Sequence, residues 1–198
     1  MNNFISVSKQ LLDHPFNPLA LALGADATFV ARSIDRDPKH LRDILAKSHL
    51  HKGTSFIEVY QNCNVFNDGA FELWTDKKQK ALSSIKLNHG EPLVFANGSL
   101  GLKLNGTKPE LVKLEEGQDT SDLWIHDEND AVKANLLSRF FDKYLSEESF
   151  PRPFGILYSE ERFTYEAAMA EQIENARKLK GDGDLDALIQ GSNSWVVD

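Results

Sequence analysis

The strongest constraint on the fold is a strand–helix–strand pattern within residues 17–62. The stretch "DATFVARS" is short, apolar and rich in β-forming residues, which suits a buried strand. Asp37 and Pro38 then predict a helix start, because an acceptor side chain caps the first turn and proline is tolerated at the first helical position. Leu41 and Ile44 recur at helical spacing before "TSFIEVYQ" provides a second strand. We therefore expect a βαβ unit with two parallel, neighbouring strands.

The region that follows has a different pattern. The segment "EPLVFANGSLGLKLNGTKPELVKL" alternates apolar and polar residues around two Asn-Gly pairs, which predicts a small antiparallel meander. Two further short runs, "SDLWIHD" and "RPFGILYS", are predicted to be strands. Two segments show helical periodicity. Their apolar faces are Val132, Leu136, Leu137 and Phe140 in the first helix, and Met169, Ile173 and Ala176 in the second.

A single βαβ unit cannot bury both faces of its sheet without further strands. The predicted fold class is therefore α/β: residues 1–62 form the C-terminal part of a larger domain with a Rossmann-like parallel sheet, and residues 63–198 form an α+β extension. We expect the chain to be a fragment or a split-gene product.

Composition limits the classes of partner. The formal net charge of −8 disfavours nucleic acid, because phosphate binding requires clustered lysine and arginine. The longest apolar run is too short to span a bilayer, and "MNNFISVSKQLLDHPF" lacks the features of a signal peptide. A single cysteine rules out an internal disulfide. These features favour a cytoplasmic protein that binds neither nucleic acid nor membrane.

Several long blocks resemble one enzyme family. The blocks "NPLALALGA", "ATFVAR…DPKHL" and "SFIEVYQNCNVFND", with the tail "GDLDALIQGSNSWVV", are similar to the second half of the β subunit of 2-oxoacid:ferredoxin oxidoreductases, especially the 2-oxoglutarate type. The resemblance runs from Phe16 to Asp198 and is weakest in the middle β region. It implies that the first part of the chain belongs to a thiamine-diphosphate-binding domain.

The resemblance also implies a reaction and a set of partners. The family oxidatively decarboxylates a 2-oxoacid in the presence of coenzyme A, with 2-oxoglutarate favoured over pyruvate for this chain. Thiamine diphosphate, held through Mg²⁺, is the electron sink, and a [4Fe–4S] cluster passes electrons to ferredoxin. An α subunit completes the active site.

This chain lacks several of the family's motifs. The Cys-x-x-Cys pair, a third early cysteine, the Gly-Asp-Gly segment and the Mg²⁺-binding Asn are all missing before Asn17. We therefore expect the isolated chain to be inactive and to bind no cofactor by itself, and we assign it no catalytic or cofactor-binding residue. The alternative function is a non-catalytic interaction module that docks on a partner subunit.

Cys63, in "QNCNVFN", is the one metal-ligand candidate. The family places a fourth cluster cysteine in a matching segment, so the resemblance implies that Cys63 is a [4Fe–4S] ligand whose companions come from another chain. The other interpretation is an inert, half-buried thiol. Asn64, Phe66 and Asn67 either shape the cluster loop or form an ordinary turn.

Two other motifs have structural explanations. His126 and Asp127 could form a metal pair or a general base, but no further ligand or nucleophile accompanies them. A strand end followed by a capping turn is therefore favoured. The stretch "GDGD" at 181–184 resembles a diphosphate-binding motif, but a helix precedes it and too few residues follow it for the Mg²⁺-binding Asn. We expect a joint between two helices, with Gly181 ending the first and Asp182 or Asp184 capping a short second helix whose Leu185, Leu188 and Ile189 face inward.

Overall fold

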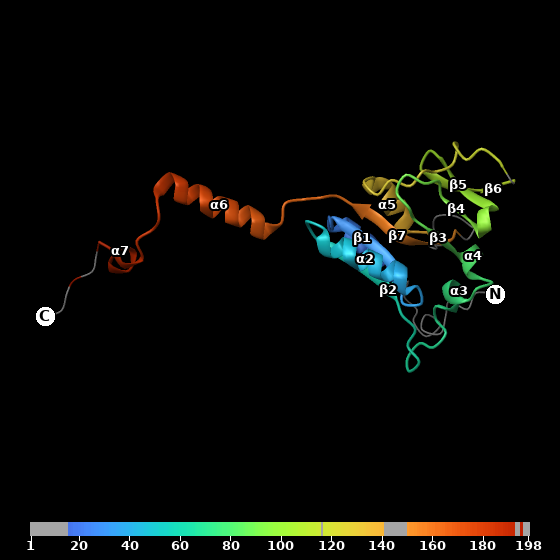
Figure 1. Cartoon of the computed structure of the whole chain (residues 1–198), viewed down its shortest axis with the longest axis horizontal. Helices are drawn as coiled ribbons and strands as arrows, with labels where there is room; N and C mark the ends of the chain where they lie inside the picture. The colour runs from blue at the N-terminus through green and yellow to red at the C-terminus, as the bar shows by residue number, and fades with distance from the viewer. Residues whose placement is uncertain (1–15, 116, 141–149, 193–194, 196–198) are drawn as a thin grey trace. The chain divides into compact units, whose positions relative to one another are not determined.

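The fold was analysed in a computed structural model that describes residues 16–115, 117–140, 150–192 and 195 (Figure 1). The chain divides into two units, Met1–Arg162 and Phe163–Asp198, and each unit is considered by itself. The predicted domain boundary at residue 62 stays a prediction. In this structure, strands from both sides of that boundary share one sheet.

The first unit is built on a four-stranded sheet with the order β2-β1-β7-β3. These strands are β1 (Phe29–Ile34), β2 (Ser55–Tyr60), β3 (Ser84–Lys86) and β7 (Arg152–Ser159). β1 and β2 are parallel and joined by α2 (Pro38–Leu50), so the predicted βαβ unit is confirmed. Asp37 caps α2 by accepting a hydrogen bond from the His40 N–H at 3.3 Å, and Pro38 is the first helical residue.

Strand β7 gives the sheet its mixed character. It pairs antiparallel with β1 and parallel with β3. The segment "RPFGILYS" is thus a strand, as predicted, and it lies at the centre of the sheet. With β7 and β2 on its two sides, β1 is buried along its whole length.

Helices cover both faces of this sheet. On one face, Ile44 of α2 packs against Phe29, Ala31 and Ile156. On the other face, Val30 and Leu157 join a larger core with residues of α1 (Pro18–Gly24) and α5 (Ala131–Ser138). The result is the layered α/β arrangement that the sequence predicts.

The predicted meander is also confirmed. A separate three-stranded antiparallel sheet contains β4 (Val94–Phe95), β5 (Leu100–Asn105) and β6 (Lys108–Lys113). Short helical turns surround the two sheets, namely α3 (Glu72–Thr75), α4 (Lys80–Ser83) and η1 (Ala96–Gly98).

One local prediction is wrong, and another holds only in part. "SDLWIHD" is not a strand, since its only β-pairing among the described residues is a single bridge between Ile125 and Pro92. Its Trp124 is buried and donates its backbone N–H to Leu102 O at 2.8 Å, so burial alone produced the strand-like pattern. The apolar face predicted around α5 is right for Leu137 and Phe140, which are buried, and for Leu136, which packs against the same core. It is wrong for Val132, which is 68% exposed. The rest of that predicted helix, beyond Phe140, lies outside the described residues.

The second unit contains α6 (Tyr165–Lys180) and α7 (Leu185–Gln190). The predicted joint at "GDGD" is confirmed: Gly181, with φ +78°, ends α6, and Asp184 caps α7 by accepting from the Ala187 N–H at 3.0 Å. Leu185, Leu188 and Ile189, predicted to face inward, are instead exposed. No helix in the described part of the chain is long and apolar enough to cross a membrane.

At Gly155, strand β7 lies close to the backbone of Leu87, which leaves no room for a side chain. Its φ is +137°, and an added Cβ would lie 2.7 Å from the carbonyl oxygen of Leu87. We expect Gly155→Ala to lower the free energy of unfolding by about 2 kcal/mol or more, because it adds backbone strain and displaces a paired segment. Urea unfolding followed by tryptophan fluorescence measures this. Gly24→Ala is the control, since its Cβ meets nothing within 4 Å; equal stability of the two variants would contradict the prediction.

Candidate functional site

The candidate site lies where β1 and β2 end. Because these strands are parallel, the residues after Ile34 and after Tyr60 meet at one edge of the sheet. This edge is where open α/β sheets bind ligands. A cleft of about 220 Å³ opens here, lined by Asp35, Arg36, Asn62, Asp68, Gly69, Phe71, Glu72 and Thr75.

The loop of residues 61–70 is closed by the side chain of Asn62. Its Nδ2 donates to Asn64 Oδ1 at 2.7 Å and to Asp68 Oδ1 at 2.9 Å. Its Oδ1 accepts from the Gly69 N–H at 2.9 Å. A single amide therefore connects both ends of the loop that carries Cys63.

Cys63 lies within this loop and is partly exposed. The backbone N–H groups of Phe66, Val65 and Asn67 lower the pKa of the Cys63 thiol. The Asn67 N–H also donates to the Cys63 carbonyl at 2.9 Å, which fixes the turn. The loop thus stabilises a thiolate, the form of cysteine that binds metals, at an accessible position.

This geometry suits one ligand of a metal cluster but does not complete one. A [4Fe–4S] cluster generally takes its ligands from four cysteines, whereas the sequence has one. Within the described residues, no group of three or more His, Cys, Asp or Glu side chains could hold a metal ion. The residues present therefore fit a single thiolate contributed to a shared site, and the ligand role of Cys63 stays a prediction.

A cluster of aromatic side chains packs together at the two ends of the loop. Tyr60, the last residue before the loop, stacks on Phe71 with ring centroids 4.5 Å apart. It also contacts Trp74 and Phe154, at 5.3 and 5.7 Å between centroids. Burial raises the pKa of the Tyr60 hydroxyl. The loop therefore begins and ends on packed aromatic rings.

Beneath Tyr60 lies a buried arginine that sequence reasoning did not single out. Arg32 is 1% exposed, pairs through Nε with Glu58, and donates from Nη1 to the Pro153 carbonyl at 3.2 Å. Its guanidinium carbon lies 5.4 Å from the Tyr60 ring centroid. A charged residue inside the apolar stretch "FVARS" was the available indication.

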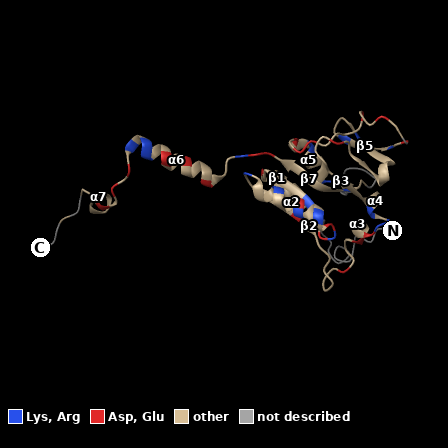
Figure 2. Cartoon of the chain, in the orientation of Figure 1, with Lys and Arg blue, Asp and Glu red and all other residues tan. Residues whose placement is uncertain are grey.

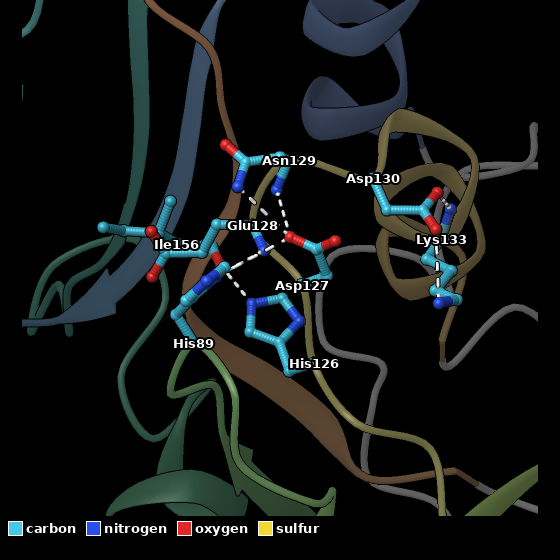
Figure 3. Close-up of polar contacts among 8 residues, drawn as sticks. All are labelled: His89, His126, Asp127, Glu128, Asn129, Asp130, Lys133 and Ile156. Atoms are coloured by element: carbon cyan, nitrogen blue, oxygen red, sulfur yellow. Dashed lines mark hydrogen bonds and ion pairs between the residues drawn. The ribbon is translucent and has the colours of Figure 1, made fainter.

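The structure separates the functional groups of His126 and Asp127 (Figure 3). His126 is buried, and its Nε2 lies 2.8 Å from the Ile156 carbonyl oxygen on β7. Asp127 instead accepts from the Asn129 N–H at 2.9 Å and lies 3.7 Å from His89 Nδ1. The two side chains thus make their polar contacts with different partners. This geometry favours the structural interpretation over a general base.

Acidic residues next to His126 cap the following helix. Asp130 accepts from the Lys133 N–H at 2.9 Å and forms an ion pair with the Lys133 ammonium at 3.3 Å. Those backbone contacts lower the pKa of Asp130. The acidic turn is thus the capping turn that the sequence indicates.

Comparison with known proteins gave related sequences and a related structure. The chain is 37% identical over 192 residues to the 2-oxoglutarate oxidoreductase subunit KorB of Mycobacterium tuberculosis, a match that covers 94% of this chain and 50% of that protein. It is 40% identical over 73 residues to a 2-oxoacid:ferredoxin oxidoreductase subunit beta of Saccharolobus solfataricus, which covers 37% of this chain and 24% of that protein. The chain therefore spans half or less of the length of these relatives. No family model matches the chain.

A solved structure has a similar fold. The 2-oxoglutarate:ferredoxin oxidoreductase from Magnetococcus marinus, with 2-oxoglutarate, coenzyme A and succinyl-CoA bound, matches with a TM-score of 0.52 over 90% of this chain and 44% of that one. The sequence identity is 20%, so this likeness concerns the fold.

The thiolate-stabilising loop can be tested by alkylation. Cys63 is the sole cysteine, so the rate of its reaction with iodoacetamide as a function of pH reports its pKa directly. We expect a midpoint below that of the urea-unfolded chain. Asn62→Ala should raise the midpoint, because the loop that aims the N–H groups at the sulfur loses its closing amide. Asn88→Ala, which removes an exposed hydrogen bond to Glu91, is the control. Identical midpoints for folded and unfolded chains would contradict the assignment.

The structural interpretation of His126 predicts a pH dependence of stability. Burial lowers the pKa of His126 and outweighs the raising effects of the Ile156 carbonyl and nearby carboxylates. The unfolded chain therefore binds more protons, and stability is lost as the pH falls below the unfolded value of about 6.5.

His126→Gln keeps a donor for the Ile156 carbonyl and removes the titration. We expect the variant to lose less stability than the parent chain between about pH 7 and pH 5, as measured by urea unfolding. Burial also lowers the pKa values of His40 and His51, but both remain in the variant, so the difference isolates His126. Parallel pH profiles would show that His126 is not the group responsible.

Proposed function

The chain belongs to the family of 2-oxoacid:ferredoxin oxidoreductase β subunits, and we propose that it forms part of an enzyme that oxidatively decarboxylates a 2-oxoacid in a coenzyme A-dependent reaction. The similarity that extends over nearly the whole chain carries this proposal. We take 2-oxoglutarate as the preferred substrate over pyruvate, because the relative with the longest match and the structure of similar fold are both named for 2-oxoglutarate. The proposed location is the cytoplasm.

In the complete enzyme, thiamine diphosphate held by Mg²⁺ supplies the electron sink, and a [4Fe–4S] cluster supplies the route for single electrons to ferredoxin. Among the residues of this chain, Cys63 is the one proposed to bind the cluster. The N–H groups of Val65, Phe66 and Asn67 favour negative charge on its sulfur. Asn62 keeps the loop closed around it.

The proposal requires further polypeptide. One thiolate is a quarter of a typical cluster's ligand set, so the other cysteines are proposed to come from further polypeptide. The match that covers half of the longer M. tuberculosis relative supports this. An α subunit is the proposed partner that completes the active site, and ferredoxin the proposed electron acceptor. By itself, the chain is proposed to bind no thiamine diphosphate and to be inactive.

The alternative is a non-catalytic module that docks on a partner subunit. One observation favours it: the described second unit has no buried residue, as expected of a segment whose apolar side chains are covered by another surface. The two functions differ in whether Cys63 holds iron.

A chimeric β subunit tests the proposal. This chain replaces the matching segment of the M. tuberculosis relative, and the chimera is produced with the α subunit of that enzyme. We expect coenzyme A-dependent reduction of ferredoxin with 2-oxoglutarate to exceed that with pyruvate at least about tenfold, and the isolated chain to show no thiamine diphosphate binding by calorimetry. A folded chimera that contains iron and turns over neither 2-oxoacid would overturn the proposed reaction.

Cys63→Ser in the chimera tests the ligand role. We expect the iron content and the visible absorbance of the cluster to fall, because an oxygen ligand replaces the thiolate. Val65→Ala is the matched control, since it changes an exposed side chain of the same loop and keeps its backbone N–H. Equal iron content in the Cys63→Ser and Val65→Ala chimeras would favour the interaction module.

A further inference from the structure

Helix α6 exposes the side chains that a helix normally buries. None of its residues is buried, and Tyr165, Met169, Ile173 and Leu179 are 77%, 43%, 47% and 85% exposed. An isolated helix of this length is marginally stable in water, because few hydrogen bonds offset the cost of nucleation. A packing partner for its apolar face would therefore add most of its stability.

The exposed face has the spacing of a coiled-coil seam. Alternating steps of four and three residues connect the positions along it, which are Tyr165, Met169, Gln172, Ala176 and Leu179. This spacing keeps a narrow stripe facing a second helix over the whole length of α6. The stripe contains small and large side chains, so two such helices can interlock.

The charges beside the seam are arranged symmetrically. Glu166 and Lys180 flank it on the same side as Ile173, at equal sequence separations from Ile173. More broadly, acidic side chains lie in the first part of α6 and basic ones gather at its end (Figure 2). A helix with this pattern is complementary to an antiparallel copy of itself.

Three other charged residues of α6 already form ion pairs within the chain. Lys178 pairs with Glu174 at 2.9 Å, and Arg177 pairs with Asp182 at 3.6 Å, on the face away from the seam. Glu166 and Lys180 form no ion pair among the described residues. They are therefore available for a partner helix.

We propose that α6 pairs with α6 of a second copy of this chain in an antiparallel, two-fold symmetric coiled coil. In this register Met169 packs against Leu179 of the second copy, and Gln172 packs against Ala176. Ile173 meets its own counterpart on the two-fold axis. Glu166 pairs with Lys180 of the second copy, and the symmetry repeats the pair. The chain thus carries a self-association surface separate from the Cys63 loop.

Charge variants of the full chain test the register. Sedimentation equilibrium over a range of concentrations is expected to show a monomer–dimer equilibrium. Glu166→Lys alone and Lys180→Glu alone each put like charges together twice, so each should weaken dimerisation about tenfold. The double variant exchanges the charges and should recover the parent affinity. An equimolar mixture of the two single variants should form a heterodimer.

Cross-linking tests the two-fold axis. With Cys63 replaced by serine, Ile173→Cys should form an intermolecular disulfide under mild oxidation, because the two thiols meet on the axis. Glu174→Cys, one residue away on the opposite face of the helix, should not form one. Both variants keep the seam and Glu166 and Lys180 intact.

Three results would overturn the proposal. They are a monomer at every accessible concentration, as expected if α6 packs on its own chain or on a different protein; a dimer whose affinity is unchanged by the single charge variants; and equal cross-linking through positions 173 and 174. None of these experiments depends on the oxidoreductase reaction, so they leave the proposed function untouched.

Discussion

The first unit depends on one buried charge, the guanidinium of Arg32 on β1. It pairs with Glu58 on β2 and donates to the Pro153 carbonyl on β7, so it connects three neighbouring strands of the sheet, β2, β1 and β7. A buried charge is costly unless it is paired and hydrogen-bonded, and loss of either partner would leave that cost uncompensated. The strands are therefore held in one arrangement by polar contacts as well as by apolar packing.

This arrangement extends to the candidate site through Tyr60. The guanidinium of Arg32 lies over its ring, and the opposite end of the loop returns to the same ring through Phe71. Because both ends of the loop are fixed, Asn62 can close it and the N–H groups near Cys63 can converge on the sulfur. The backbone N–H groups that lower the pKa of Cys63 therefore belong to a loop whose two ends are held by packed aromatic rings. Hydrogen-bond donors of this kind also change the reduction potential of clusters bound by thiolates.

The elements with local determinants were predictable from the sequence. Asp37 and Pro38 mark the start of α2, and Asn-Gly pairs mark the turns of the meander, because capping and turn formation involve neighbouring residues. The antiparallel direction of β7 was not predictable, because an apolar run does not encode its orientation. Likewise "SDLWIHD" has the burial of a strand, but the backbone partners that decide the matter lie in distant segments.

The same distinction applies to the site. Cys63 could be singled out because the residues around it resemble a family. The charge of Arg32 inside an apolar stretch was visible, but its partners were not, since Glu58 and Pro153 lie 26 and 121 residues away in the sequence. The role of Asn62 in closing the loop was equally unpredictable, because asparagine is common in ordinary turns. Its role follows only from the three hydrogen bonds that its side chain makes in the folded loop, two as donor and one as acceptor.

The two units follow different rules of stability. The first packs its own apolar cores around β1 and β7. The described part of the second has no buried side chain, so the stability of α6 must come from whatever covers its seam. If that partner is a second copy, helix formation and association are linked, and each strengthens the other by mass action. In that case the stability of α6 depends on protein concentration.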